Sequence, residues 1–211
     1  MTATALKRTR LSLHGVAELV LAGPQYAAHH DIRLRVTPGG FGTVTGPDLR
    51  VDRLELVTPS ARLPLDGSFA GLARAAGVEA RALRDVYAAG PEVRPDDLVV
   101  IDPDAADLVL DAFAVGDAGL RAFAPDLEPV LWPEHFDLAI TQGEVNYGVS
   151  PGDAHVAEPY AYVGPWAPRT GDFWNTEFGA ARPLTELDAV DALVAFFHEG
   201  ARRAGSDPTR P

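Results

Sequence analysis

Three short segments between residues 131 and 166 constrain the fold of this chain most strongly. Each alternates apolar residues with polar or aromatic ones, and in the first Phe136 and Leu138 alternate with His135 and Asp137. A repeat of two residues is typical of a strand with one buried face. We therefore expect three strands that pair as an antiparallel unit.

Three main helices are expected. The first spans residues 9–22, where Thr9 is a suitable cap and Gly23-Pro24 is a stop signal. The second begins at Asp102-Pro103, because aspartate caps helices and proline suits the first turn. The third spans residues 185–204.

An antiparallel meander is expected between residues 32 and 65. Pro38-Gly39-Gly40 turns the chain between its first two strands. A longer strand over 49–57 shows a slip in its alternation, which predicts a bulge near Asp52-Arg53. A last strand begins at Arg62.

The middle of the chain gives shorter elements. Residues 68–76 predict a helix that Gly77 closes, and residues 81–88 predict another. Residues 91–97 are polar and contain proline, which indicates a connector. Residues 98–101 predict a short buried strand.

Together these elements predict an α+β fold, in which antiparallel sheets pack with about three main helices. The hydrophobic content of 46% is ordinary for a globular chain and allows a sizeable core. We expect residues 1–211 to form a single domain, and the connector near 91–97 is where two subdomains would separate.

Charge and composition limit the partners. The net charge of −12 disfavours binding to nucleic acid and to anionic membranes. The absence of cysteine excludes disulfides, thiolate nucleophiles and thiolate zinc sites. His14 and Glu18 interrupt the apolar run near the N-terminus, which argues against a signal peptide, and no apolar stretch is long enough to span a bilayer. We expect a cytoplasmic protein with neither nucleic acid nor a membrane as its partner.

The late strands would place polar and aromatic side chains on one face. A small molecule bound there is the leading functional hypothesis, and a concave site of this kind would also suit an enzyme. The expected ligand-binding residues are Trp132, Glu144, Asn146, Glu158, Tyr160, Tyr162, Trp166 and Trp174. His135 could act as acid or base, oriented by Asp137, so these two are the catalytic candidates. The sequence names neither a ligand nor a cofactor.

Other interpretations of the same residues stay open. The aromatic side chains could form the exposed patch of a non-catalytic protein-interaction module, and the acidic charge would then select a basic partner. They could also be a solvated sheet face with a hydrophobic plug over its edge. His135, Asp137, His155 and Glu158 are suitable metal ligands, but two of them lie beside or within an irregular loop, so we predict no metal.

Four motifs carry a resemblance to a known family. They are Trp-Pro-Glu-His-Phe-Asp-Leu-Ala from Trp132, Tyr-Gly-Val-Ser-Pro-Gly-Asp from Tyr147, Glu-Pro-Tyr-Ala-Tyr-Val-Gly-Pro-Trp from Glu158, and Ile-Arg-Leu-Arg-Val-Thr-Pro-Gly-Gly-Phe from Ile32. Together they resemble an uncharacterised actinobacterial protein family over residues 131–183 and, more loosely, 31–58. The resemblance implies an intracellular actinobacterial protein, and it carries over no activity and no catalytic residue.

Overall fold

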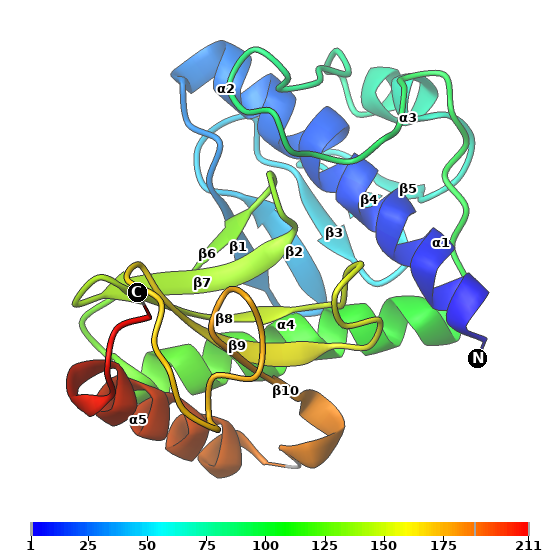
Figure 1. The fold of residues 1–211 in the computed structure, drawn as a ribbon. Coiled ribbons are helices and arrows are strands. Elements are labelled where there is room, and N and C mark those ends of the chain that lie inside the picture. Colours follow the sequence, from blue (N-terminus) through cyan, green and yellow to red (C-terminus); the bar gives the residue numbers. More distant parts are fainter. Residues whose placement is uncertain (1, 188, 211) are drawn as a thin grey trace. The chain divides into compact units, whose positions relative to one another are not determined.

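The computed structural model describes residues 2–187 and 189–210 and has an α+β fold in which the strands pair antiparallel (Figure 1). The chain divides into two compact units. Unit 1 comprises Met1–Ala114 and Val130–Phe136, and unit 2 comprises Val115–Pro129 and Asp137–Pro211. Residues 91–97 lie inside unit 1. The expectation of a single domain stays a prediction.

Unit 1 begins with a continuous run of helix. Its parts are α1 (Ala3–Gly15), the π-helix η1 (Val16–Ala22) and α2 (Gly23–His29). The Thr2 side chain caps the start by accepting from the N–H of Ala5, and His30 ends the run in the left-handed conformation. The predicted bounds of 9–22 were therefore wrong at both ends.

The two predicted boundary signals have other roles. Thr9 is buried in α1, and its hydroxyl accepts from the N–H of Asp102. Gly23-Pro24 lies directly after η1 and does not stop the helix. A proline ring crowds the carbonyl four residues earlier and supplies no N–H, and the wider π-helical turn before Pro24 accommodates both effects.

The strands of unit 1 form the expected meander. They are β1 (Leu34–Thr37), β2 (Gly40–Thr43), β3 (Arg50–Asp52), β4 (Glu55–Val57), β5 (Arg62–Pro64) and β6 (Val130–Trp132), in the order β6-β1-β2-β3-β4-β5. The predicted bulge near Asp52-Arg53 is instead a tight hairpin, since Asp52 pairs with Glu55 and Arg53 adopts a positive φ of 56°. A two-residue turn slips the alternation as a bulge would.

One face of this meander is the core of unit 1. Leu34, Phe41, Val51 and Leu56 are fully buried, and η1 packs against β1 and β2 (Figure 1). All seven η1 residues are buried, and every one of them except Glu18 is apolar.

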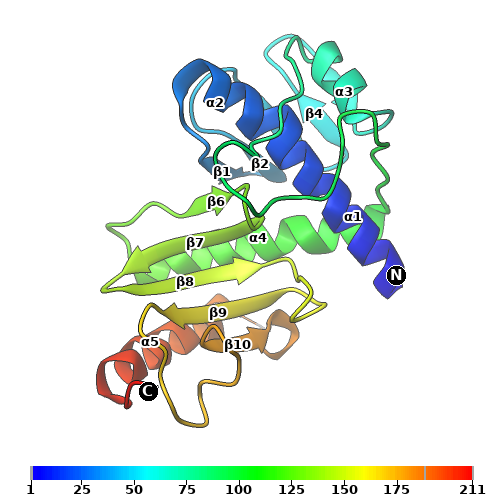
Figure 2. The same cartoon turned by 45° about the horizontal axis from the view of Figure 1, so that its top comes forward.

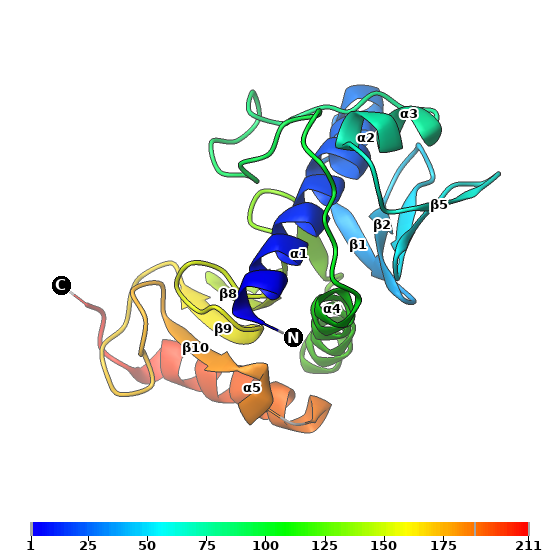
Figure 3. The same cartoon turned by 90° about the vertical axis from the view of Figure 1, so that its right-hand side faces the viewer.

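In the middle of unit 1 one of the two predicted helices is present and the other is absent. α3 (Phe69–Ala75) begins where Ser68 accepts from the N–H of Gly71, as the sequence predicted, and it lies beside η1 (Figure 3). Residues 81–88 form turns and loop, and residues 98–101 form no strand, so both predictions were wrong. In both stretches backbone N–H groups bond to the N-terminal helix: Arg81 donates to the Leu19 carbonyl, and Val100 donates to the Ser12 hydroxyl.

Unit 2 holds the late strands. β7 (Asp137–Gln142), β8 (Val145–Ser150), β9 (Tyr160–Pro165) and β10 (Ala180–Pro183) are antiparallel neighbours in that order (Figure 2). The helix α4 (Pro103–Phe123) crosses the boundary between the units, and Asp102 caps it by accepting from the N–H of Ala105. α5 (Val190–Ser206) follows a 3₁₀ turn, η2 (Leu184–Glu186), and so begins five residues later than predicted.

The helices cover one face of the unit 2 strands. α5 packs on β8 and β9, and one glycine of α5 and one of α4 lie close to the strands. A Cβ added to Gly200 would come 2.6 Å from Val163, and one added to Gly116 would come 2.9 Å from Val149. The other face of the strands carries three of the residues that the sequence assigned to a binding site, namely Asn146 of β8 and Tyr160 and Tyr162 of β9. No helix in the described part of the chain is long and apolar enough to cross a membrane.

Candidate functional site

Two of the predicted ligand-binding residues lie together in unit 2. Tyr162 donates a short hydrogen bond to Asp137, and Tyr160 donates one of 2.5 Å to Asp153. Phe178 covers both rings, with its ring centroid 6.3 Å from each. Tyr160 is only 4% exposed. This part of the face is a packed hydrogen-bonded cluster.

Gly148 explains where Tyr162 lies. It is opposite Tyr162 in the pairing of β8 with β9. A Cβ at Gly148 would come 2.5 Å from the Tyr162 ring, so only glycine lets the ring lie across the neighbouring strand.

Asp153 is held in its charged form by several donors. Burial pushes the pKa of its carboxyl upward, but hydrogen bonds from the Tyr160 hydroxyl and from the N–H groups of Val156 and His155 outweigh that effect. The pKa of Asp153 therefore lies below its ordinary value. The same carboxylate, with desolvation, raises the pKa of Tyr160 above the ordinary range, so both groups keep their charge state at neutral pH.

The remaining predicted residues of unit 2 lie outside this cluster, and three of them lie together, since Trp166 donates through its Nε1 to Asn146 at 3.4 Å and through its backbone N–H to the Glu144 carbonyl at 2.9 Å. Asn146 accepts from Thr141, while Trp174 is 6% exposed and donates to Asp207. Trp166 is 64% exposed. The other two lie at the surface, Glu144 in a turn with positive φ and Glu158 beside Thr185.

Two predicted residues belong to unit 1. Trp132 ends β6, and His135 is an exposed side chain with its Nε2 3.9 Å from the Glu134 carboxylate. His135 and its proposed partner Asp137 thus fall in different units. Within the described residues no group of three or more histidine and carboxylate side chains is close enough to hold a metal ion.

Unit 1 contains a pocket that sequence reasoning missed. Its volume is about 400 Å³. The lining residues are Glu18, Arg84, Tyr87, Ala88, Ala89, Gly90, Pro91 and Glu92. One wall is thus a residue of η1 and the rest is the loop that follows residue 83. None of the residues assigned to the binding face lines it.

The π-helix binds this loop through its backbone. In η1 the N–H of Gly23 donates to the carbonyl of Glu18, a spacing of five residues. The corresponding donor for the Leu19 carbonyl would be Pro24, which has no N–H. The N–H of Arg81 takes its place at 2.9 Å. Because Pro24 has no N–H, the Leu19 carbonyl is available to accept from the N–H of Arg81 in the pocket loop.

Gly23 provides the space for the same contact. A Cβ at Gly23 would come 2.0 Å from the carbonyl oxygen of Arg81, which is backbone and cannot turn aside. The glycine and proline that resemble a stop signal are therefore the docking point of the pocket loop.

Glu18 is a buried carboxylate that lines the pocket. Its side chain is 3% exposed, and its two oxygens accept from the Tyr87 hydroxyl at 2.8 Å and from the N–H of Leu83 at 3.3 Å. Burial raises the pKa of Glu18 above its ordinary value of 4.5, and these hydrogen bonds with the charge of Arg84 only partly offset it. Gly90 has a φ of 151°, which favours glycine, and a Cβ there would come 2.7 Å from Glu18 Oε2.

Tyr87 stays protonated beside this carboxylate. Burial raises its pKa well above the ordinary range, and the hydrogen bond to Glu18 with the charges of Glu18 and Glu134 raises it further. The phenol is therefore a permanent donor at the pocket.

His14 lies one helical turn before Glu18 and is also kept neutral. Burial lowers its pKa to about 4, and the nearby charges of His135 and Arg10 act in the same direction. Its ring stacks on Phe136, with centroids 5.1 Å apart, and its Nε2 donates to the Pro133 carbonyl at 2.7 Å. The backbone acceptor thus fixes the proton of the neutral ring on Nε2 and offsets part of the effect of burial on the pKa.

The sequence does contain a signal for this pocket. Glu18 is the one charged residue in the apolar run from Val16 to Ala22, and a charge at such a position must find partners or a function. The loop residues that meet it are 65 or more positions away and carry no recognisable motif.

Comparisons with known proteins give no match: no family model, curated protein or solved structure resembles this chain significantly.

Proposed function

We propose that this protein binds a small molecule in the pocket of unit 1, and that the ligand carries a cationic amine. The observation that carries the proposal is a buried carboxylate, Glu18, that lines a cavity of about 400 Å³ and forms no ion pair within the described part of the chain. Pockets with few converging polar groups and a perturbed carboxyl are typical of binding sites.

The charge of the pocket favours a cation. Glu92 also lines it, and Glu134 is close enough to influence Tyr87. Arg84 opposes these carboxylates with one positive charge. A buried carboxylate is costly unless it is paired, so an ammonium group that donates to Glu18 would recover part of its lost solvation.

The apolar part of the pocket limits the size of such a ligand. Ala88, Ala89 and Pro91 supply short side chains, and Gly90 supplies none. A cavity of this volume is at the small end of the range for ligand sites. A primary amine with a compact apolar body fits both conditions.

The binding face predicted in unit 2 stays a separate prediction. Two of its tyrosines are already bonded to carboxylates beneath Phe178, and Trp166 is its exposed ring. The pocket of unit 1 has the stronger claim because its carboxylate combines burial with access to a cavity.

Ligand-induced thermal stabilisation tests the proposal. Benzylamine and n-butylamine should raise the melting temperature of the protein in proportion to their concentration, while benzyl alcohol and n-butanol should not. Glu18→Gln should abolish the shift, because the amide cannot pair with an ammonium group. Asp153→Asn is the matched control in unit 2 and should leave the shift unchanged.

Two outcomes would reject the proposal. One is an equal response to the amines and the alcohols, or no response to either. The other is a response that Asp153→Asn removes and Glu18→Gln does not, which would move the binding site to the face of unit 2.

A further inference from the structure

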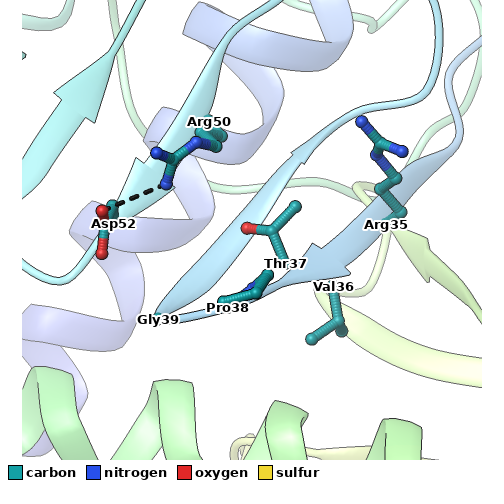
Figure 4. Close-up of a pocket in the computed structure, with 7 residues that line it drawn as sticks. All are labelled: Arg35, Val36, Thr37, Pro38, Gly39, Arg50 and Asp52. Atoms are coloured by element: carbon teal, nitrogen blue, oxygen red, sulfur yellow. Dashed lines mark ion pairs between the residues drawn. The ribbon is translucent and has the colours of Figure 1, made fainter.

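We propose a second site in unit 1, where the outer face of the meander binds an oxyanion between Arg35 and Arg50. The face opposite the core carries a depression of about 600 Å³. Its lining residues are Arg35, Val36, Thr37, Pro38, Gly39, Arg50 and Asp52. The Arg35, Thr37 and Arg50 side chains stand on this face, and Val36 points the opposite way (Figure 4).

Strand register aligns the arginines. Arg35 of β1 pairs with Gly42 of β2, and Gly42 pairs with Arg50 of β3. The two arginines therefore stand on either side of a strand that has no side chain at that position. Neighbouring strands are about 4.8 Å apart, so their backbones are separated by about 10 Å, which two arginine side chains can span toward a shared anion.

The strand between the two arginines contains two glycines that cannot be replaced without disturbance. A Cβ at Gly42 would come 2.8 Å from Leu49 O, and one at Gly40 would come 2.3 Å from Val51 O. Glycine inside a strand weakens it and marks a close approach of backbone or ligand. Here the glycines allow β3 to approach β2 closely, and a Cβ at Gly42 would also come 2.8 Å from the Cβ of Arg50.

Two polar groups of the depression, on Arg35 and Thr37, have no hydrogen-bond partner within the described residues. Arg35 is exposed and forms no ion pair or hydrogen bond within the described residues. The Thr37 hydroxyl oxygen is buried and has no hydrogen-bond partner. An oxyanion in this depression would give both groups acceptors.

Arg50 belongs to a network of ion pairs beside the depression. Its guanidinium is 3.1 Å from Asp52, but Asp52 also accepts from Arg62 at 2.9 Å. Arg62 is also paired with Glu55 at 2.7 Å, so two carboxylates face two guanidinium groups, and the two arginines lower the pKa of Asp52, Arg62 most strongly. Asp52 holds the Arg50 guanidinium in place, and Arg35 supplies the positive charge of the depression that has no ion pair within the described residues.

The geometry favours a carboxylate or phosphate group of a small ligand. Guanidinium groups bind both with paired hydrogen bonds, and a protein of net charge −12 offers few other places for an anion. The site is independent of the amine pocket, since no residue lines both.

Titration by NMR at constant ionic strength tests this site. Inorganic phosphate and malonate are the two probes, and the N–H signals of Gly40 and Gly42 with the Nε–H of Arg35 are the reporters. We expect saturable shifts at these positions, and the probe that binds more tightly identifies the anion class. Arg35→Gln and Arg50→Gln should each weaken binding tenfold or more, as loss of a charged hydrogen bond does.

Arg53→Gln provides the matched control. Arg53 lies in the next turn, is paired with Asp107 and carries the same charge outside the depression. Its replacement should leave the dissociation constant within twofold of the original. Absence of saturable shifts with both probes would overturn the proposal, as would an equal loss of affinity in Arg53→Gln.

Discussion

Two tyrosine–carboxylate pairs of this protein look alike and differ in their electrostatics. In unit 1 the Tyr87 hydroxyl donates to Glu18, and in unit 2 the Tyr160 hydroxyl donates to Asp153. For both carboxyls burial is the largest influence, and it raises the pKa. Yet the pKa of Glu18 is raised and that of Asp153 is lowered.

The difference lies in the number and length of the donors. Asp153 accepts from one hydroxyl and from two N–H groups of its own loop, at distances between 2.5 and 2.9 Å. Glu18 accepts from one hydroxyl at 2.8 Å and from one distant N–H at 3.3 Å. Hydrogen bonds to the charged form must exceed the cost of desolvation before a carboxyl is held ionised. Asp153 therefore holds its own loop through hydrogen bonds, whereas Glu18 can still accept a hydrogen bond from a ligand.

Disruption of the contact between Gly23 and the Arg81 carbonyl should have the largest effect on stability. Gly23→Ala places a Cβ against the Arg81 carbonyl and should lower the free energy of unfolding by about 3 kcal/mol, as other overpacked sites do. Urea denaturation measures the change. Gly205→Ala in α5 is the control, because nothing lies within 4 Å of its Cβ. If Gly23→Ala is as stable as Gly205→Ala, the backbone contact does not hold the loop.

His14 should make unit 1 sensitive to acid. Because its pKa falls from 6.5 to about 4 on folding, the unfolded chain binds more protons between these values. Its contribution is complete above pH 6.5 and is lost as the pH falls toward 4, by about 3 kcal/mol at most. Urea unfolding at several pH values should show a smaller loss for His14→Gln than for the wild type. Parallel profiles for the two proteins would mean that His14 is not desolvated.

Replacement of Asp153 or of Glu18 by its neutral amide should change the stability of the protein in opposite directions. Asp153→Asn should cost about 1 kcal/mol at neutral pH, because it weakens hydrogen bonds to a charged group. The stability that Asp153 provides is present above its ordinary pKa of 3.8 and disappears as the pH falls through the lower folded value.

The opposite sign applies to Glu18. The folded protein retains the Glu18 proton to higher pH than the unfolded chain, so stability falls as the pH rises from 4.5 through the folded value. Glu18→Gln should therefore gain on the wild type as the pH rises above 4.5, whereas Asp153→Asn should lose relative to the wild type as the pH rises to 3.8 and keep that deficit at higher pH. Equal pH profiles for the two variants would remove the distinction between the pairs.

The sequence predicted the fold class because its signals are local. Alternation marked the strands of both units, and Ser68 and Asp102 marked helix starts that the structure confirms. Gly23-Pro24 misled because the same dipeptide that ends helices can also expose a carbonyl to a distant segment. Residues 81–88 have helical composition, but their N–H groups bond to η1, and such tertiary contacts override local preference.

The candidate sites were less accessible from the sequence. The two faces of β9 follow from alternation, so Tyr160 and Tyr162 were correctly expected on the same side. Their carboxylate partners were not both foreseeable, because Asp153 reaches Tyr160 through loop geometry that has no period. The pocket at Glu18 depends on pairing between residues 65 and 69 positions apart, which a single sequence does not reveal.

The most direct test of this account is an NMR titration of the side-chain carboxyl carbons of Glu18 and Asp153 in one sample. The account predicts that Glu18 titrates above 4.5 and Asp153 below 3.8, and that benzylamine moves the Glu18 midpoint downward while leaving Asp153 unchanged. A Glu18 midpoint at or below 4.5, or a response to the amine at Asp153 in place of Glu18, would contradict it.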